Sequence, residues 1–311
     1  MHGTVDMKKI VEYIRSFFND VNKPVLASVT LLTASFIFCN YYFKIDKQIG
    51  EHSFPLRFFY RYCISLGAFF IPYCLYAVIA KKNYFSNKTF ILLVLIAPAI
   101  FTLKMEVFTQ LPIIDEAAMN HYWNRILFWP IRLVMTASLL FIIWKSFYRD
   151  NTFFGLTLKQ FEWRPYAWML LIMVPLIIAA SAQPDFLHAY PKLKMVSDAI
   201  GNIPRSWLYK LLFELSYGSD FISIELFFRG FLILGFIKWA GKDAILPMAC
   251  FYCTIHFGKP LGECISSYFG GILLGIVVYH TRSIFGGLMV HLGIAWLMEA
   301  GGYFGNAYFV K

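Results

Sequence analysis

The chain has 311 residues, of which 59% are hydrophobic and 15% are charged. A soluble domain has about 45–50% apolar and about 25% charged residues, so this composition excludes an ordinary soluble domain and indicates several membrane spans. The formal net charge is +10 at pH 7. The Lys and Arg residues stand in short patches between apolar runs, as in the cytoplasmic loops of membrane proteins. We therefore expect membrane lipid, and no nucleic acid, as a partner.

Residues 1–23 are expected to form one short amphipathic helix. Ile10, Ile14 and Phe17 recur at helical spacing after a pair of lysines. No compact apolar region and cleavage site of a secretory signal follow the basic residues. The pattern is typical of a helix that lies on the inner surface of the membrane.

The rest of the chain predicts an all-α, polytopic transmembrane bundle of about eight spans, because a bilayer core needs about 20 apolar residues per helix. Pro130 is expected to break one of the spans, and residues 207–217 form a short segment whose crossing is open. The apolar segments, in chain order, are residues 24–43, 58–80, 89–103, 123–144, 166–182, 207–217, 222–239, 245–257, 265–279 and 284–300.

The charges of the loops predict a cytoplasmic N-terminus. The loop after the second segment carries three lysines and no acid, whereas the next loop contains Glu106, Asp115 and Glu116. Basic loops stay on the inner side of a membrane. We expect an integral protein of the cell (inner) membrane, and the side of the C-terminus depends on whether residues 207–217 cross.

The two parts of the chain differ in their polar residues. Residues 24–200 contain few polar groups within their apolar runs, whereas residues 201–311 concentrate Glu, Arg, His and Gly there. We expect the first part to supply N-terminal transmembrane helices and the second to form the core that carries any functional site.

Four ionisable residues of this core stand in strongly apolar surroundings: Glu225, Arg229, His256 and His291. A charged group near the centre of a membrane helix costs about 2.5–3.5 kcal/mol on insertion scales, so such groups indicate function. Glu225 and Arg229 are four residues apart and share a helix face, where they can pair. The alternatives are a structural ion pair and two histidines that form hydrogen bonds between helices.

These residues resemble motifs of the CPBP family, which includes CAAX-processing endopeptidases. The resemblance covers roughly residues 205–300 and rests on Glu225-x-x-x-Arg229, Tyr252-x-x-x-His256 and His291, in that order. It implies a CPBP-like core and peptide hydrolysis inside the membrane. A carboxylate and one His would activate water, while the second His and an Asn would polarise the scissile carbonyl.

Two positions depart from the family pattern. Ile224 stands where the family has its first Glu, and Ala295 stands at the Asn or Asp position. Asp220, one turn before Ile224, and Glu263 are candidates to replace the missing carboxylate. For Glu263 the plainer interpretation is a favourable charge at a helix N-terminus, after a break at residues 258–260.

The chemistry that these residues predict leaves alternatives open. Glu225, His256 and His291 have the ligand types of a catalytic zinc site, but the chain lacks an HExxH motif, so a divalent metal is not favoured and no cofactor is expected. The substrate would be a membrane-embedded or membrane-proximal peptide. The alternatives are an inactive scaffold or immunity protein of the same fold and a proton-coupled transporter, which the absence of a visible repeat disfavours.

Overall fold

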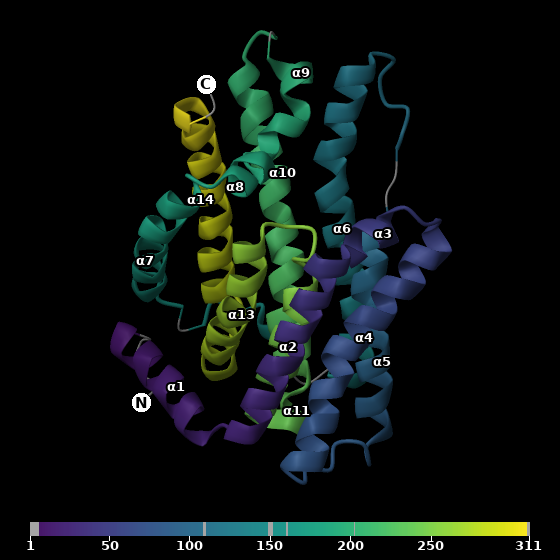
Figure 1. Cartoon of the computed structure of the whole chain (residues 1–311), viewed down its shortest axis with the longest axis vertical. Helices are drawn as coiled ribbons and strands as arrows, with labels where there is room; N and C mark the ends of the chain where they lie inside the picture. The colour runs from purple at the N-terminus through teal and green to yellow at the C-terminus, as the bar shows by residue number, and fades with distance from the viewer. Residues whose placement is uncertain (1–5, 108–109, 149–151, 160, 202, 310–311) are drawn as a thin grey trace.

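The structure is a computed structural model that describes residues 6–107, 110–148, 152–159, 161–201 and 203–309. These residues form helices and no strand (Figure 1). In chain order they are α1 (Met7–Asp20), α2 (Lys23–Phe43), α3 (Ile45–Gly50), α4 (Phe54–Ile79), α5 (Lys88–Glu106), α6 (Ala117–Phe147), η1 (Phe153–Gly155), α7 (Arg164–Ala180), α8 (Pro184–Ala189), η2 (Lys192–Val196), α9 (Ser197–Ile200), α10 (Ser206–Glu225), η3 (Leu226–Gly235), α11 (Ile237–Ala240), η4 (Gly241–Ala244), α12 (Ile245–Thr254), α13 (Leu261–Thr281) and α14 (Phe285–Phe309).

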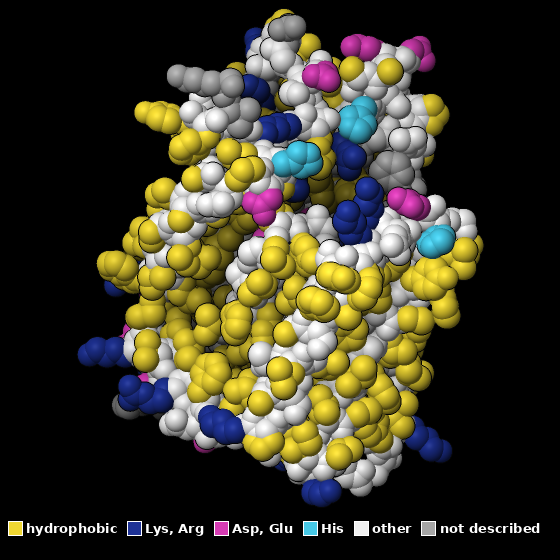
Figure 2. Space-filling model, in the orientation of Figure 1, with side chains coloured by type: hydrophobic (Ala, Val, Ile, Leu, Met, Phe, Trp, Pro, Cys, Tyr) yellow, Lys and Arg dark blue, Asp and Glu magenta, His cyan; other side chains and the backbone are white. Residues whose placement is uncertain are grey.

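The expectation of an all-α membrane bundle is confirmed. In the described ranges, five helices are long and apolar enough to cross a membrane, namely α2, α4, α5, α6 and α13. A sixth span results if α7 and the segment Pro184–Ile200, which meet at 101°, count as one. Figure 2 shows apolar side chains over the middle of one face and charged side chains towards both ends. The number of eight spans stays a prediction.

Polar caps fix where several helices begin. The side chain of Asn22 accepts a hydrogen bond from the Val25 amide at 3.1 Å, at the start of α2. Asn87 accepts one from the Phe90 amide at 3.0 Å, at the start of α5. Each cap satisfies a backbone N–H that the first helical turn leaves without a partner. These local signals explain why the observed helices begin close to the expected boundaries.

The expected short segment 207–217 is not separate from the segment after it. Helix α10 runs through this region and continues directly into η3, a π-helix of ten residues. Gly218 does not break the helix. It instead gives room for α14, because a Cβ at this position would lie 3.2 Å from Leu292 Cδ1. A π-helical turn is rare and frequently marks a functional site, and here it follows Glu225.

Pro130 also fails to break its helix, contrary to the sequence-based expectation. Helix α6 is continuous over 31 residues, with Pro130 inside it. Proline removes one backbone hydrogen bond and clashes with the preceding turn, which costs about 3 kcal/mol in an exposed helix. Transmembrane helices tolerate it because neighbouring helices and local adjustments satisfy the freed backbone group.

Helix α12 is shorter than the expected segment and does not extend across the bundle. It has ten residues, all buried, and ends at Thr254. At 1.5 Å per residue it is about 15 Å long, which is half of a bilayer core. The chain then turns and starts α13 after Pro260, so the break expected at residues 258–260 is observed. His256 therefore lies in a turn inside the protein.

Helix α1 packs against the lower end of the bundle in Figure 1. Ile10 and Phe17 are buried, and Ile10 belongs to an apolar cluster with residues of α7, α13 and α14. The ring of Tyr13 stacks on His280 of α13, with centroids 4.3 Å apart. The apolar side of α1 thus contacts its own chain, and its position at the membrane surface stays a prediction.

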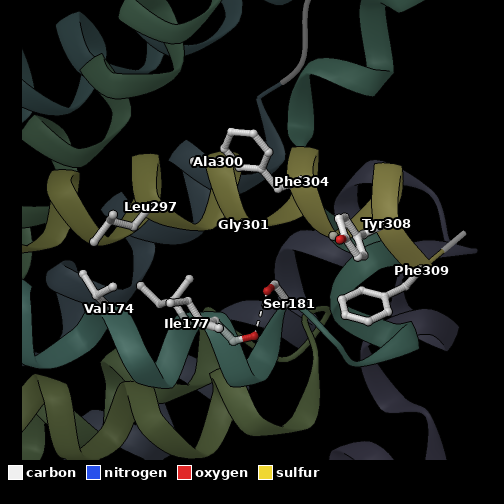
Figure 3. A pocket seen from close by; sticks show the side chains of 11 residues that line it. Val174, Ile177, Ser181, Leu297, Ala300, Gly301, Phe304, Tyr308 and Phe309 are labelled. Atoms are coloured by element: carbon white, nitrogen blue, oxygen red, sulfur yellow. Dashed lines mark hydrogen bonds between the residues drawn. The ribbon is translucent and has the colours of Figure 1, made fainter.

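A groove lies between α7 and α14 (Figure 3). Its cavity volume is about 320 Å³, and the lining is apolar except for the hydroxyls of Ser181 and Tyr308. The hydroxyl of Ser181 donates a hydrogen bond to the Ile178 carbonyl at 2.7 Å, so it offers no free donor to a ligand. The groove is therefore an apolar surface, in keeping with a bilayer as its surroundings.

Candidate active site

Glu225 is the last residue of α10, and its side chain is fully buried. Arg229 follows one turn later in η3 and is also fully buried. Its Nη1 atom lies 3.2 Å from Oε1 of Glu225. The spacing of four residues places both groups on one helix face, as the sequence predicts. Pairing offsets part of the cost of two charges in an apolar interior.

His291 joins this pair from α14. Its Nδ1 atom lies 2.9 Å from Oε1 of Glu225, and the ring of Phe221 contacts the imidazole edge-on. A carboxylate can only accept, so Nδ1 carries the hydrogen of the neutral imidazole and Nε2 is an acceptor. The carboxyl of Glu225 comes close to the α14 backbone at Gly287, where a Cβ would lie 2.5 Å from Oε2. Only a glycine leaves this space open.

Tyr252, from α12, extends the network. Its hydroxyl oxygen lies 3.0 Å from Nε2 of His291. Because that nitrogen is an acceptor, the phenol donates the hydrogen bond. The guanidinium carbon of Arg229 lies 4.1 Å from the centroid of the Tyr252 ring, in a cation–π contact. Four helical elements, α10, η3, α12 and α14, thus contribute to one continuous chain of polar contacts.

His256 lies one turn beyond Tyr252, in the turn between α12 and α13, and is 5% exposed. Its Nδ1 atom lies 3.1 Å from the backbone carbonyl oxygen of Tyr252. A carbonyl accepts, so Nδ1 donates and Nε2 keeps its lone pair. The two rings also contact each other, with centroids 4.8 Å apart. His256 is therefore held in the tautomer that a general base requires.

Helix α2 holds the turn that carries His256. Asn40 donates a side-chain hydrogen bond to the carbonyl oxygen of Phe257 at 3.1 Å. The hydroxyl of Tyr41 donates to the carbonyl oxygen of Lys259 at 2.6 Å. These contacts satisfy backbone groups that the end of α12 leaves open and fix the turn from outside the core.

Residues 211–297 match the family model described as type II CAAX prenyl endopeptidase Rce1-like. This segment is an Rce1-like domain. The match covers Glu225, Tyr252, His256 and His291, and it confirms the resemblance to the CPBP family that their spacing indicates. No curated protein and no solved structure matches the chain.

The Rce1-like domain brings four of the six predicted site residues together: Glu225, Arg229, His256 and His291. Glu225 contacts Arg229 and His291 directly. His256 reaches this group through Tyr252, whose ring contacts both imidazoles. The packing of the helices therefore brings these four side chains to one place in the bundle.

Asp220 and Glu263, the two carboxylates considered as replacements, have other partners. Asp220 pairs with Lys104 of α5 at 2.8 Å. Glu263 pairs with Lys259 at 2.6 Å and accepts a hydrogen bond from the Tyr190 hydroxyl at 3.0 Å. Among the described residues, neither is hydrogen-bonded to a histidine. Glu263 also lies in the first turn of α13, where the helix dipole favours an acid.

At the two positions where this chain departs from the family pattern, the side chains are apolar and lie inside the protein. Ile224 and Ala295 are both buried. Neither side chain can accept a proton or donate a hydrogen bond. These two positions therefore offer no catalytic group, and the polar side chains that lie together in the Rce1-like domain include Glu225, His256, His291 and Tyr252.

Sequence reasoning did not single out the hydroxyl of Tyr252, which it treated as the aromatic residue of a motif. The residue type alone could have indicated that this hydroxyl has a partner, because a buried Tyr hydroxyl usually forms a hydrogen bond. Its partner, however, lies 39 residues further along the chain. Only the packing of α12 near α14 shows which group that partner is.

The described part of the chain contains no group of three or more His, Cys, Asp or Glu side chains placed to hold a metal ion. Within the Rce1-like domain, Glu225 and His291 are in contact, but the Tyr252 ring lies between His291 and His256. Glu225, His291 and Tyr252 thus form a row of hydrogen-bonded side chains. His256 is hydrogen-bonded to the backbone carbonyl of Tyr252.

Substitution of Gly287 by alanine is expected to lower the free energy of unfolding by about 1–3 kcal/mol, the usual cost of overpacking. The new Cβ would lie 2.5 Å from Oε2 of Glu225 and would push the carboxyl away from His291. Thermal unfolding in detergent measures the effect. Gly270→Ala is the matched control, because a Cβ there meets no atom within 4 Å. Equal unfolding temperatures of the two variants would contradict the close approach.

Proposed function

We propose that this protein is an intramembrane endopeptidase that hydrolyses a peptide bond in a membrane-embedded or membrane-proximal substrate. The observation that carries the proposal is the row Glu225–His291–Tyr252 next to His256, within an Rce1-like domain. Ionisable groups inside a membrane bundle are costly to bury, and a connected set of them is typical of a functional site.

His256 is the general base in this proposal. The family position for a water-activating carboxylate is Ile224, which cannot take a proton. Nδ1 of His256 is engaged with the Tyr252 carbonyl, so the lone pair of Nε2 is available to accept a proton from water. General-base catalysis of this kind contributes about 10²–10⁴-fold to a rate.

Glu225 and Arg229 supply the charges of the site. Oε2 of Glu225 is buried without a hydrogen-bond partner among the described residues, and so are Nε and Nη2 of Arg229, whereas Nη1 forms the ion pair with Oε1. Buried polar groups nearly always have partners, so such atoms indicate a place where further polar groups bind. A peptide amide and a water molecule have the donors and acceptors that these atoms lack.

A second candidate is an inactive protein of the same fold that acts as a scaffold or immunity factor. The observation in its favour is that the two motif positions that depart from the family, Ile224 and Ala295, are buried and apolar. In this case the row of polar residues would only hold α10, α12 and α14 together.

Cleavage of membrane peptides by the purified protein in lipid bilayers tests the proposal. Products of a peptide mixture are identified by mass spectrometry. His256→Ala is expected to slow cleavage at least about tenfold, because it removes the general base. His280→Ala, on α13 outside the site, is the matched control and should leave the rate unchanged. We propose that no metal takes part, so a chelator should also leave the rate unchanged.

Three outcomes of this experiment would each contradict a part of the proposal. Cleavage that is equal in the wild type and His256→Ala would remove His256 from the mechanism. No cleavage by the wild type, with an intact fold, would favour the scaffold function. Loss of cleavage with the chelator, restored by a divalent metal, would overturn the proposal of metal-free hydrolysis.

We further propose that the protein lies in the cell membrane with its N-terminus in the cytoplasm. Helix α1 and the connection between α4 and α5 lie at the lower end in Figure 1. In Figure 2 this end shows dark blue Lys and Arg side chains with little magenta, whereas the upper end shows Lys and Arg together with Asp, Glu and His. Such an excess of positive charge is typical of the inner side. Helix α14 ends at the opposite, upper end.

A further inference from the structure

We propose that the hydroxyl of Tyr252 is the general acid of the reaction, which protonates the amine that leaves when the peptide bond breaks. This inference rests on the proposed peptidase function and adds a catalytic residue to it. Peptide hydrolysis needs such a group, because an amine leaves poorly as an anion.

The hydrogen bonds of the site exclude His291 from this role and leave Tyr252. The single N–H of neutral His291 is on Nδ1 and points to Glu225, 2.9 Å away. Its other nitrogen, Nε2, accepts from the Tyr252 hydroxyl at 3.0 Å. Tyr252 therefore provides the one acidic hydrogen in the row that is not bound to the carboxylate.

Arg229 places a positive charge over the phenol ring and offsets part of the cost that burial adds to a phenolate. Its guanidinium carbon lies 4.1 Å from the ring centroid, over the face of the phenol. Both side chains are buried, so water screens this contact little. A positive charge stabilises a phenolate more than a neutral phenol, and guanidinium stays charged in proteins. Arg229 thus favours the state of Tyr252 that follows proton transfer.

The base and the acid lie on successive turns of one segment. His256 follows Tyr252 by four residues, its Nδ1 is bound to the Tyr252 carbonyl, and the two rings are in contact at 4.8 Å. Their separation is therefore set by the end of α12 and the turn that follows it. A peptide bond beside these two rings has the base close to its carbonyl carbon and the acid close to its nitrogen.

Peptide hydrolysis by His256 and Tyr252 takes three steps. Water gives one proton to Nε2 of His256 while its oxygen forms a bond to the carbonyl carbon. The carbon–nitrogen bond then breaks, its electron pair goes to nitrogen, and the proton of the Tyr252 hydroxyl goes to the same nitrogen. The proton held by His256 returns to the phenolate, so both groups are restored and one water is consumed.

Tyr252→Phe separates this role from a structural one when two substrates are compared. One is a peptide that the wild type cleaves, and the other has the same acyl part with a p-nitrophenyl ester as leaving group. An amine needs a proton to leave, whereas p-nitrophenolate leaves without one. We expect kcat for the peptide to fall about 10²-fold, within the range of general acid catalysis, while kcat for the ester changes little.

Tyr268→Phe is the matched control, because Tyr268 also loses one hydroxyl hydrogen bond, to Thr30, away from the site. Unfolding temperatures of both variants show whether the fold is kept. Equal losses for the peptide and the ester in Tyr252→Phe would overturn the acid role, as would no loss for the peptide. If the wild type cleaves neither substrate, the proposed function fails and the inference fails with it.

Discussion

Replacement of Arg229 by methionine is expected to lower the free energy of unfolding by about 3–5 kcal/mol, because it leaves one half of a buried ion pair without compensation. Arg229 and Glu225 are both fully buried, and Nη1 lies 3.2 Å from Oε1. Methionine fills a similar volume without charge. The carboxylate would then remain in an apolar interior, with the Nδ1 hydrogen of His291 as its neighbour. The midpoint of thermal or denaturant unfolding in detergent measures the loss.

A double-mutant cycle distinguishes the pair from packing. Glu225→Met and the variant with both substitutions complete the cycle, and the double variant should be more stable than Arg229→Met alone, since no isolated charge remains. The exposed pair Lys242–Asp20 provides a matched control. Lys242→Met should cost about 0–1 kcal/mol, as for other surface ion pairs. A loss in Arg229→Met no greater than in this control would show that the buried charges are not coupled.

The sequence was sufficient to predict the pairing of Glu225 with Arg229, because helix geometry alone brings residues four apart onto one face. It was also sufficient to place His291 near them, since ionisable groups in apolar helices need polar partners. Apolar runs of adequate length gave most of the long helices, although α6 begins earlier than expected, at Ala117, and α14 continues further, to Phe309. These features depend on local spacing and on the cost of burying charge.

Other features depend on contacts between distant segments. The sequence predicts separate apolar segments at residues 207–217 and 222–239, but α10 continues directly into η3, and α14 packs against the space that Gly218 leaves. Asp220 is a plausible replacement base by its position in the helix, yet Lys104 of α5 binds it. The hydrogen bond from Tyr252 to His291 likewise needs the packed bundle. No pattern within one helix contains this information.

The carboxyl of Glu225 illustrates the difference between residue type and role. In the sequence it is the remaining member of a family motif that normally has two glutamates. In the structure one of its oxygens serves both Arg229 and His291. That oxygen orients the imidazole of His291 and fixes its tautomer, because a hydrogen bond to one ring nitrogen determines which nitrogen carries the hydrogen. The function that the motif assigns to the missing carboxylate therefore passes, in our proposal, to His256.

Restoring the carboxylate with Ile224→Glu is expected to increase the rate of peptide cleavage, by less than the factor of about 10²–10⁴ that a complete general base contributes, because His256 already supplies one in our proposal. Ile224 precedes Glu225, is buried in α10, and stands at the family position of the water-activating residue. The new carboxylate would give the reacting water a second proton acceptor in addition to the imidazole of His256. Initial rates in bilayers, at equal amounts of folded protein, measure the change.

Ile224→Gln is the control that decides what the carboxylate contributes, because glutamine has nearly the same shape and polarity but cannot take up a proton at neutral pH. Both variants bury a polar group in an apolar position and should lose a similar amount of stability, which their unfolding temperatures will show. A faster rate with Glu than with Gln would mean that the site still positions substrate and water, and that the chain lacks only a strong base. If the rates are equal, residue 224 does not face the reacting water in this protein, and His256 carries the base function without help from that position.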